Sequence, residues 1–234
     1  MSIPVAHRGL AENQLSGFIT AYAAGFQVCE CDIHETRDHE LVVCHDDCAP
    51  GMTVPIKASL YADVKIHIPS LKSVVATVPA SSQLLIELKP SSFSNIAWEN
   101  LRDMIGHQSS QFIFISFHLG VLIEVKKILP SFKTIYLTES MNPSQDAYVN
   151  SVAALYQRAV IVKALGIAGV GFQSDRLMLT KEEVASLHTE GLMLQAWYGA
   201  HADKRPYTQV EEAAMLASLT HLDVDYINVD YLIA

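Results

Sequence analysis

Hydrophobic and polar positions along this chain follow two alternating periods. Short apolar runs recur, and most are separated by longer segments whose apolar residues have the three- and four-residue spacing of a helix. The first such segment, 15–24, places Leu15, Phe18 and Tyr22 on one face and is followed by Gly25, a common residue after a helix end. The pattern therefore predicts strands and amphipathic helices in turn.

The same reading applies to the rest of the chain. Strands are expected at 3–6, 28–33, 84–88, 112–116, 134–137, 169–172, 192–197 and 226–229, with one more extended piece at 41–44. Helices are expected at 15–24, 70–78, 95–105, 119–129, within 152–165, and at 181–190 and 210–219. Pro69 is expected in the first turn of the second helix, and Thr180 with Glu183 predicts a capping box.

Strand and helix alternate about eight times, which predicts an α/β fold whose parallel sheet closes into a TIM (β/α)8 barrel. We expect residues 1–234 to form a single domain, because no linker or low-complexity segment interrupts the alternation. The irregular segment 47–67 predicts a short insertion after the strand end at His45.

Composition excludes several classes of protein. Half of the 234 residues are hydrophobic, which is typical of a folded globular chain. A formal net charge of -9 argues against nucleic-acid or anionic-membrane binding, which requires a concentration of lysine and arginine. The most apolar segment, 159–172, contains Lys163 and is too short to be transmembrane, and no signal peptide is evident. We expect a soluble, cytoplasmic protein.

Two acids lie in the second expected strand, Glu30 and Asp32. Alternate side chains of a strand share a face, so both carboxylates point the same way, and their repulsion predicts a cation between them. Glu87 ends the next barrel strand, and the carboxyl ends of barrel strands surround one active-site mouth. Three converging carboxylates would supply hard oxygen ligands for one divalent cation, Mg²⁺ or Ca²⁺.

Histidines and basic residues end other expected strands. His7 and His45 are suited to proton transfer near neutral pH, and Arg8 and Lys89 could bind negative oxygens. A metal site beside such groups is suited to phosphate-ester cleavage. The chain has no P-loop and no G-x-G-x-x-G motif, so nucleotide phosphotransfer has no support.

Four cysteines, Cys29, Cys31, Cys44 and Cys48, lie close together in the sequence. Their spacing allows a zinc site if the two pairs meet. The favoured interpretation is that Cys29 and Cys31 fill the outer face of the second strand as small apolar residues, because they alternate with Glu30 and Asp32.

The histidines, acids and basic residues described above, with the sequence around them, resemble the glycerophosphodiester phosphodiesterase family. The resemblance covers nearly the whole chain in order and spacing, and its strongest part runs from His7-Arg8-Gly9 to His45-Asp46. The matching motifs are Glu12-Asn13, Glu30-x-Asp32, Thr36-x-Asp38, Val42-Val43-x-His45-Asp46, Ile68-Pro69-Ser70-Leu71, Glu87-x-Lys89-Pro90, Ser116-Phe117, Trp197 and Tyr226-Ile227-Asn228-Val229-Asp230.

The resemblance implies a barrel enzyme that hydrolyses a small-molecule glycerophosphodiester to an alcohol and sn-glycerol 3-phosphate. It implies roles for eight residues: His7 and His45 as the acid–base pair, Glu30, Asp32 and Glu87 as divalent-metal ligands, Arg8 and Lys89 at the phosphate, and Trp197 at the glycerol part. Asp230 is expected to support the site or accept a hydrogen bond that closes the barrel.

The chain also departs from the family pattern at several positions. Ala11 and Gln14 replace the usual proline and threonine, the insertion is shorter than usual, and Tyr198-Gly199-Ala200 follows Trp197. These differences bear on specificity. Two alternatives therefore stay open: a lysolipid phosphodiesterase or phospholipase D-like lyase that releases a cyclic phosphate, and a non-catalytic barrel that binds zinc or another ligand.

Overall fold

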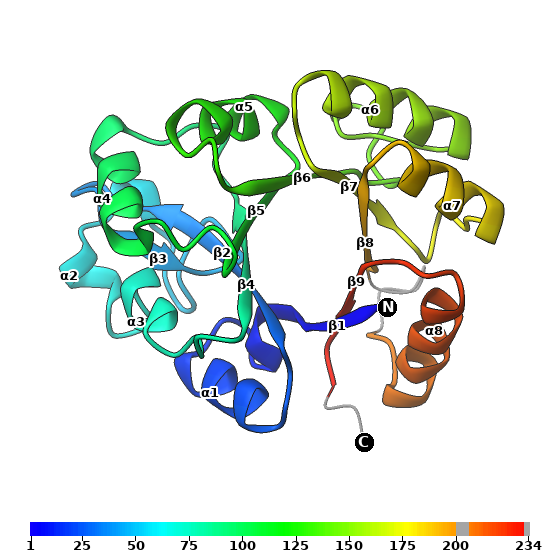
Figure 1. Ribbon diagram of the computed structural model, residues 1–234. Coiled ribbons are helices and arrows are strands. Elements are labelled where there is room, and N and C mark those ends of the chain that lie inside the picture. The colour runs from blue at the N-terminus through cyan, green and yellow to red at the C-terminus, as the bar shows by residue number, and fades with distance from the viewer. Residues whose placement is uncertain (200–205, 232–234) are drawn as a thin grey trace.

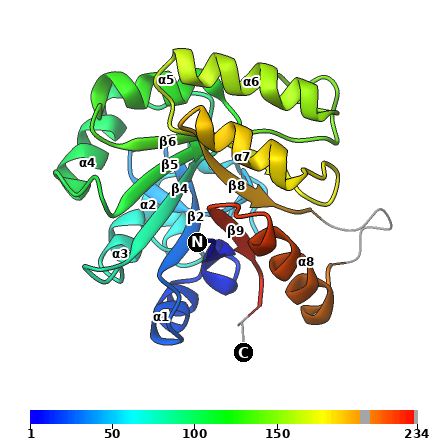
Figure 2. The same cartoon turned by 45° about the vertical axis from the view of Figure 1, so that its right-hand side comes forward.

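The computed structural model describes residues 1–199 and 206–231. Its barrel strands are β1 (Ile3–Ala6), β2 (Val28–Glu35), β4 (Gln83–Leu88), β5 (Phe112–Ser116), β6 (Lys133–Leu137), β7 (Gly169–Gln173), β8 (Met193–Trp197) and β9 (Tyr226–Val229). The longer helices are α1 (Leu15–Ala23), α4 (Asn95–Ile105), α5 (Leu119–Ile128), α6 (Val152–Ala164), α7 (Lys181–Thr189) and α8 (Gln209–His221). Figures 1 and 2 show these helices around the outside of the strands.

The sheet closes where the first strand meets the last. Its order is β1-β9-β8-β7-β6-β5-β4-β2-β3, where β3 is the short strand Leu41–Val43, and β1 also pairs with β2. All barrel pairings are parallel, with Val5 opposite Val28 on one side and opposite Asn228 on the other. The predicted TIM (β/α)8 barrel is therefore confirmed, and the strand ends that carry the candidate residues face one mouth.

The alternation of side chains separates two apolar regions. One set, which includes Val5, Leu85 and Ile135, fills the barrel interior. A second set, which includes Cys29, Cys31 and Phe18, packs between the strands and the helices. The cysteines of β2 thus form the packed outer face that the sequence predicts, while their neighbours point inward.

The predicted insertion is present and has a small core of its own. Strand β3 (Leu41–Val43) returns antiparallel along the end of β2, so it lies outside the barrel ring. Beyond it, η2 (Ile56–Ala58) and α2 (Tyr61–Val64) pack around buried residues that include Cys44 and Val64. The chain enters this insertion through His45, which places that histidine beside the barrel mouth.

One predicted helix start is wrong. Helix α3 covers Leu71–Val75, and Ser70 is its N-cap, with its side chain accepting a hydrogen bond from the Ser73 backbone. Pro69 therefore lies before the helix rather than in its first turn, because the serine oxygen satisfies a free amide there. The capping box of α7, from Thr180 and Glu183, is confirmed.

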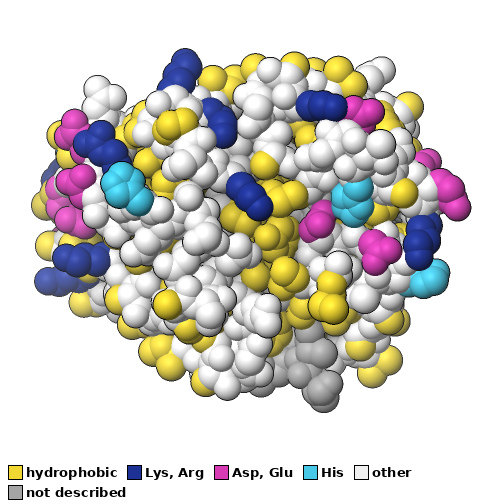
Figure 3. Space-filling view, in the orientation of Figure 1, with side chains coloured by type: hydrophobic (Ala, Val, Ile, Leu, Met, Phe, Trp, Pro, Cys, Tyr) yellow, Lys and Arg dark blue, Asp and Glu magenta, His cyan; other side chains and the backbone are white. Residues whose placement is uncertain are grey.

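Surface charge is mixed on the face that Figure 1 presents. There, lysine and arginine side chains lie scattered among acidic ones, and apolar side chains gather near the centre (Figure 3). Within the described part of the chain, every helix is too short or too polar to cross a lipid bilayer.

Candidate active site

The loop between β1 and α1 has an unusual backbone that positions Arg8 at the barrel mouth. Arg8, Leu10, Glu12 and Asn13 all have positive φ angles, of 48°, 61°, 45° and 66°. Side chains other than glycine rarely adopt this conformation, which costs on the order of 1 kcal/mol or more per residue. The coil turns the Arg8 amide towards Glu30, whose Oε2 accepts its hydrogen bond at 3.0 Å.

Two glycines allow this loop to lie against α1. A Cβ atom on Gly9 (φ 62°) would lie 2.9 Å from the Phe18 ring, and one on Gly17 would lie 2.4 Å from the Gly9 carbonyl oxygen. Both distances are far below van der Waals contact. The H-R-G sequence thus combines two candidate site residues, His7 and Arg8, with the glycine that lets the loop fold back.

Three carboxylates converge inside the mouth, as the sequence predicts. Glu30, Asp32 and Glu87 each offer an oxygen within 4.8 Å of the others, and all three residues are buried. Among the described residues they are the only group of three or more His, Cys, Asp or Glu side chains placed to hold one metal ion. The cysteines belong to no such group there, so the zinc alternative has no structural support.

Two cations neutralise part of this negative charge. Lys89 Nζ lies 3.0 Å from Glu87 Oε1 and 3.4 Å from Asp32 Oδ1, and Arg8 Nε lies 3.5 Å from Asp32 Oδ2. Burial raises the pKa of Asp32, but the charges of Lys89 and Arg8 outweigh it and lower that pKa overall. Basic side chains therefore lie against Asp32 and Glu87, whereas Glu30 receives only the backbone amide of Arg8 from this pair.

The negative charge of Glu30 is less well neutralised than that of Asp32. Burial, together with the charge of Asp32, raises the pKa of the Glu30 carboxyl to about 8. Its Oε1 atom is buried and has no hydrogen-bond partner among the described residues. A buried carboxylate oxygen without a partner is destabilising, so this atom is a place where a cation would bind favourably.

Asn13 holds the acidic group in position, and the sequence reading gave it no role of its own. Its side-chain amide donates to Asp32 Oδ2 at 2.8 Å, and its Oδ1 accepts from the Asp32 backbone at 3.3 Å. Only 2% of Asn13 is exposed. Its place in the Glu12-Asn13 motif was the signal that could have found it.

Each candidate histidine has a carboxylate on its Nδ1 atom. His7 Nδ1 lies 2.6 Å from Asp230 Oδ1, and His45 Nδ1 lies 2.7 Å from Asp46 Oδ1. Burial lowers the pKa of His7, but Asp230 and Glu30 outweigh it and raise that pKa overall. The second ring nitrogen of His7, Nε2, lies 4.0 Å from Glu30 Oε2, and neither histidine uses Nε2 to contact the carboxylate that holds its Nδ1.

The strands also place His45. The Cys44 amide donates to the Asp32 carbonyl at 3.0 Å, and His34 Nε2 lies 3.4 Å from the His45 carbonyl oxygen. His34 is buried in β2 and points to the same face as Glu30 and Asp32, so it contacts the His45 backbone from the barrel side. Burial, then the charge of Lys89, lowers the pKa of His45.

A cavity of about 140 Å³ lies at the barrel mouth. It is lined by six of the eight predicted site residues, His7, Arg8, His45, Glu87, Lys89 and Trp197. Glu30 and Asp32 are each 1% exposed and lie behind this wall. Trp197 donates from Nε1 to the Thr138 carbonyl and packs edge-on against Phe117, so its ring is fixed.

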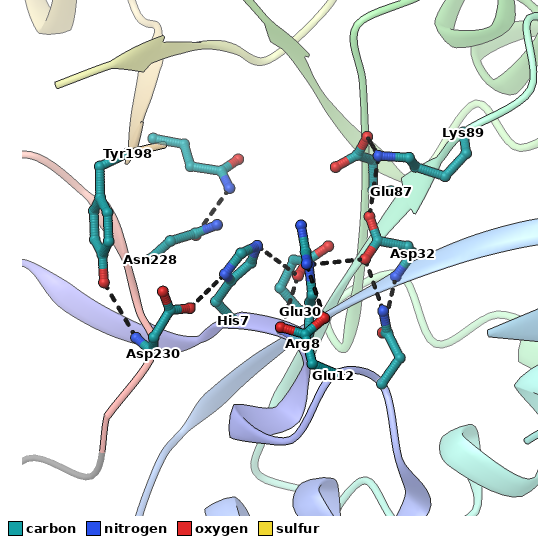
Figure 4. Close-up of polar contacts among 12 residues, drawn as sticks. His7, Arg8, Glu12, Glu30, Asp32, Glu87, Lys89, Tyr198, Asn228 and Asp230 are labelled. Carbon is teal, nitrogen blue, oxygen red and sulfur yellow. Dashed lines mark hydrogen bonds and ion pairs between the residues drawn. The ribbon is translucent and has the colours of Figure 1, made fainter. Parts of the chain in front are cut away.

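Figure 4 shows His7 at the centre of these contacts, with Asp230 and Tyr198 on one side and the acids on the other. The Asp230 backbone amide donates to Glu212 Oε2 at 2.6 Å and lies 3.2 Å from the Tyr198 hydroxyl. Glu212 comes from α8 and is only 3% exposed. Sequence reasoning missed it, because a glutamate in a helix is ordinarily solvated. Ala200 and His201 lie outside the described residues.

Fold and site together define a (β/α)8 barrel with an acidic, histidine-flanked cavity at the carboxyl ends of its strands. A model of the glycerophosphoryl diester phosphodiesterase family matches residues 5–230. The chain belongs to this family of phosphoric diester hydrolases, and the enzyme class that the sequence predicts is confirmed.

Individual proteins are similar to this chain in sequence or in fold. A glycerophosphodiester phosphodiesterase of Bacillus altitudinis is 27% identical over 252 residues, which covers 97% of this chain and 93% of that protein. The crystal structure of the Thermotoga maritima glycerophosphodiester phosphodiesterase has a TM-score of 0.74 at 20% identity, covering 99% of this chain and 96% of the other. An Oleispira antarctica phosphodiesterase in complex with its product sn-glycerol-3-phosphate has a TM-score of 0.75 at 18% identity, covering 99% and 94%.

Proposed function

We propose that this protein hydrolyses glycerophosphodiesters to an alcohol and sn-glycerol 3-phosphate with the help of one divalent cation, Mg²⁺ or Ca²⁺. The observation that carries the proposal is the convergence of Glu30, Asp32 and Glu87 beside two carboxylate-held histidines. The product bound to the Oleispira antarctica relative is of the same chemical class.

The residues of the acidic group fit a hard divalent cation. All their donor atoms are carboxylate oxygens, the ligands that Mg²⁺ and Ca²⁺ prefer, and Glu30 Oε1 lacks another partner among the described residues. Glu30, Asp32 and Glu87 would hold the ion. When bound, the cation would polarise the phosphoryl group and offset its negative charge.

Arg8 and Lys89 are proposed to hold the phosphate. Both line the cavity. Arg8 Nε is buried without a hydrogen-bond partner among the described residues, although it lies 3.5 Å from a carboxylate of Asp32. An unsatisfied guanidinium donor at the cavity wall would bind a phosphate oxygen with good geometry.

His7 and His45 are proposed to move the protons of the reaction. Asp230 and Asp46 hold their Nδ1 atoms, so each histidine presents Nε2 for exchange. One histidine takes a proton from the attacking water as its oxygen bonds to phosphorus. The other gives a proton to the alcohol oxygen as the phosphorus–oxygen bond breaks, which yields the alcohol and the phosphomonoester. Trp197 would line the space for the glycerol part.

The test is release of sn-glycerol 3-phosphate from glycerophosphocholine by the purified protein, with and without a chelator. We expect activity that the chelator abolishes and that Mg²⁺ or Ca²⁺ restores. Glu30→Gln, which keeps the shape of the side chain, should lower kcat at least about 100-fold if Glu30 binds the ion. The exposed Glu40, on the same hairpin, gives the matched control Glu40→Gln.

Three results would contradict the proposal. Full activity in the presence of chelator, or in Glu30→Gln, would remove the metal site from the mechanism. Phosphorus NMR of the product distinguishes the remaining alternative, because a cyclic phosphate that persists would assign the protein to the cyclising, lyase-like reaction instead.

A further inference from the structure

Two buried amide side chains from neighbouring strands line the same cavity. Gln195 on β8 and Asn228 on β9 point inward, and Gln195 Nε2 donates to Asn228 Oδ1 at 3.2 Å. Gln195 is 0% exposed and Asn228 is 7% exposed. In Figure 4, Asn228 lies beside His7, on the side away from Asp32 and Lys89.

The surroundings of this pair leave part of it unsatisfied. Gln195 Oε1 is buried and has no hydrogen-bond partner among the described residues. Its inward-facing neighbours along the same two strands, Met193 and Tyr226, belong to the apolar barrel interior. A barrel wall of this kind is ordinarily completed by apolar residues, so a polar pair with an unpaired atom indicates a ligand.

The chemistry of two amides limits what that ligand can be. The hydrogen bond within the pair uses the NH₂ group of one side chain and the carbonyl oxygen of the other, whichever way each side chain is turned. One carbonyl oxygen and one NH₂ group remain for the cavity. A hydroxyl group matches both, because it donates to the carbonyl and accepts from the amide. The pair carries no charge, so neither a phosphate nor a quaternary ammonium is favoured there.

We propose that Gln195 and Asn228 bind a hydroxyl group of the glycerol part of the substrate and select substrates that carry it. This inference rests on the proposed function. It assigns each half of the cavity to a different part of the substrate. The charged half, with Arg8, Glu87 and Lys89, takes the phosphate, and the neutral half, with the amide pair beside Trp197, takes the glycerol.

The test compares two substrates that differ only in these hydroxyls, glycerophosphocholine and propyl phosphocholine. Wild-type protein should prefer the first. Gln195→Met and Asn228→Leu keep similar volumes and remove the amides, so each should lower kcat/KM for glycerophosphocholine about 10- to 100-fold. Each should leave kcat/KM for propyl phosphocholine within about twofold, because no hydroxyl is present to be bound.

Tyr226→Phe is the matched control. Tyr226 also points into the barrel from β9, but its hydroxyl bonds to Gln83 and it does not line this cavity. That variant should keep the wild-type preference. Equal losses on both substrates in Gln195→Met and Asn228→Leu would overturn the inference, since they would indicate a structural role.

Binding measurements separate this inference from the proposed function. Calorimetry of wild-type protein with sn-glycerol 3-phosphate and with propyl phosphate needs no turnover. Tighter binding of the first, lost in Asn228→Leu, supports the amide pair even if the diesters are not hydrolysed. Equal binding of the two, or binding of neither, overturns it.

Discussion

His7 and His45 both have a carboxylate on Nδ1, yet the two carboxylates differ in how firmly they are held. The Asp230 backbone is fixed by Glu212 and Tyr198 near the last strand, and its side chain is 48% exposed. The Asp46 side chain is 82% exposed and follows His45 directly in the chain. A carboxylate on a rigid element orients an imidazole better than one on an open loop.

This difference predicts unequal effects of two matched substitutions. Asp230→Asn should lower kcat for glycerophosphocholine about 10- to 100-fold, because His7 loses the negative charge that holds its ring and stabilises its protonated form. Asp46→Asn should lower kcat less than about threefold, since water can replace an exposed carboxylate. Initial rates at saturating substrate measure both, with melting temperature as the folding check. A larger loss in Asp46→Asn would reverse this ranking.

Single residues also show what the sequence can predict and what it cannot. The two-residue period of a strand was enough to place Glu30 and Asp32 on one inward face. The same parity joins Gln195 to Trp197 and Asn228 to Asp230, and it could have marked the amides as inward-facing. It could not show that they meet, because their contact depends on the register of β8 against β9.

At the scale of elements, the approach of the β1–α1 loop to α1 depends on Gly17. We expect Gly17→Ala to destabilise the protein by about 1–3 kcal/mol, because its Cβ would overlap the Gly9 carbonyl. Activity should fall as well, since the same loop carries His7 and Arg8. Gly120→Ala in α5 is the control, because its Cβ would meet nothing within 4 Å. Urea unfolding measures both, and equal stability of the two variants would contradict the packing argument.

The hairpin of β2 and β3 is tied to α4 by a network around Glu35. The Glu35 carboxylate accepts hydrogen bonds from the backbone and side chain of Ser94, the N-cap of α4, and lies 2.6 Å from His39 Nδ1. Burial raises the pKa of Glu35, but these hydrogen bonds outweigh it and lower that pKa overall. The ionised form is therefore more favourable in the folded protein than in the unfolded chain.

The lowered pKa of Glu35 determines how the stability of the protein depends on pH. The stabilisation is fully present above the ordinary pKa of a glutamate and is lost as the pH falls through the lower, folded value. Glu35→Gln should thus lower the free energy of unfolding by about 1 kcal/mol near neutral pH, allowing for solvent screening, and by less near pH ~3. Urea titrations at both pH values, with Glu40→Gln as control, measure it. The same loss at both would refute the assignment to the charge.

Elements were predicted well where local sequence decides them. The Thr180 and Glu183 capping box and the bounds of α4 needed no tertiary information. The position of β3 required tertiary information, because a short apolar run does not show whether a strand joins the barrel or returns beside β2. The start of α3 was missed because Pro69 and Ser70 both carry helix-start signals and only one can be the N-cap.

For the whole molecule, the acidic group links metal binding to stability. An ion that binds only the folded protein, at about 100 times its dissociation constant, adds about 2.7 kcal/mol. For a chain of this size we expect saturating Mg²⁺ or Ca²⁺ to raise the melting temperature by about 5–10 °C. Differential scanning calorimetry measures the shift.

Variants of the acidic group provide the control for that prediction. The double substitution Glu30→Gln with Glu87→Gln should abolish most of the shift, because only Asp32 of the three ligands remains. A shift of the same size in this variant would mean that the ion binds elsewhere.

The pairing of β1 with β9 has a consequence for how the site is completed. His7 and Asp230 are 223 residues apart in the sequence, and they meet where β1 pairs with β9. Glu30, Asp32 and Glu87 lie on the neighbouring strands β2 and β4, so their approach does not require β9, whereas the contact of His7 with Asp230 does. The geometry proposed for His7 therefore forms only after the first and last strands of the barrel pair, so we expect a polypeptide truncated before β9 to lack hydrolytic activity.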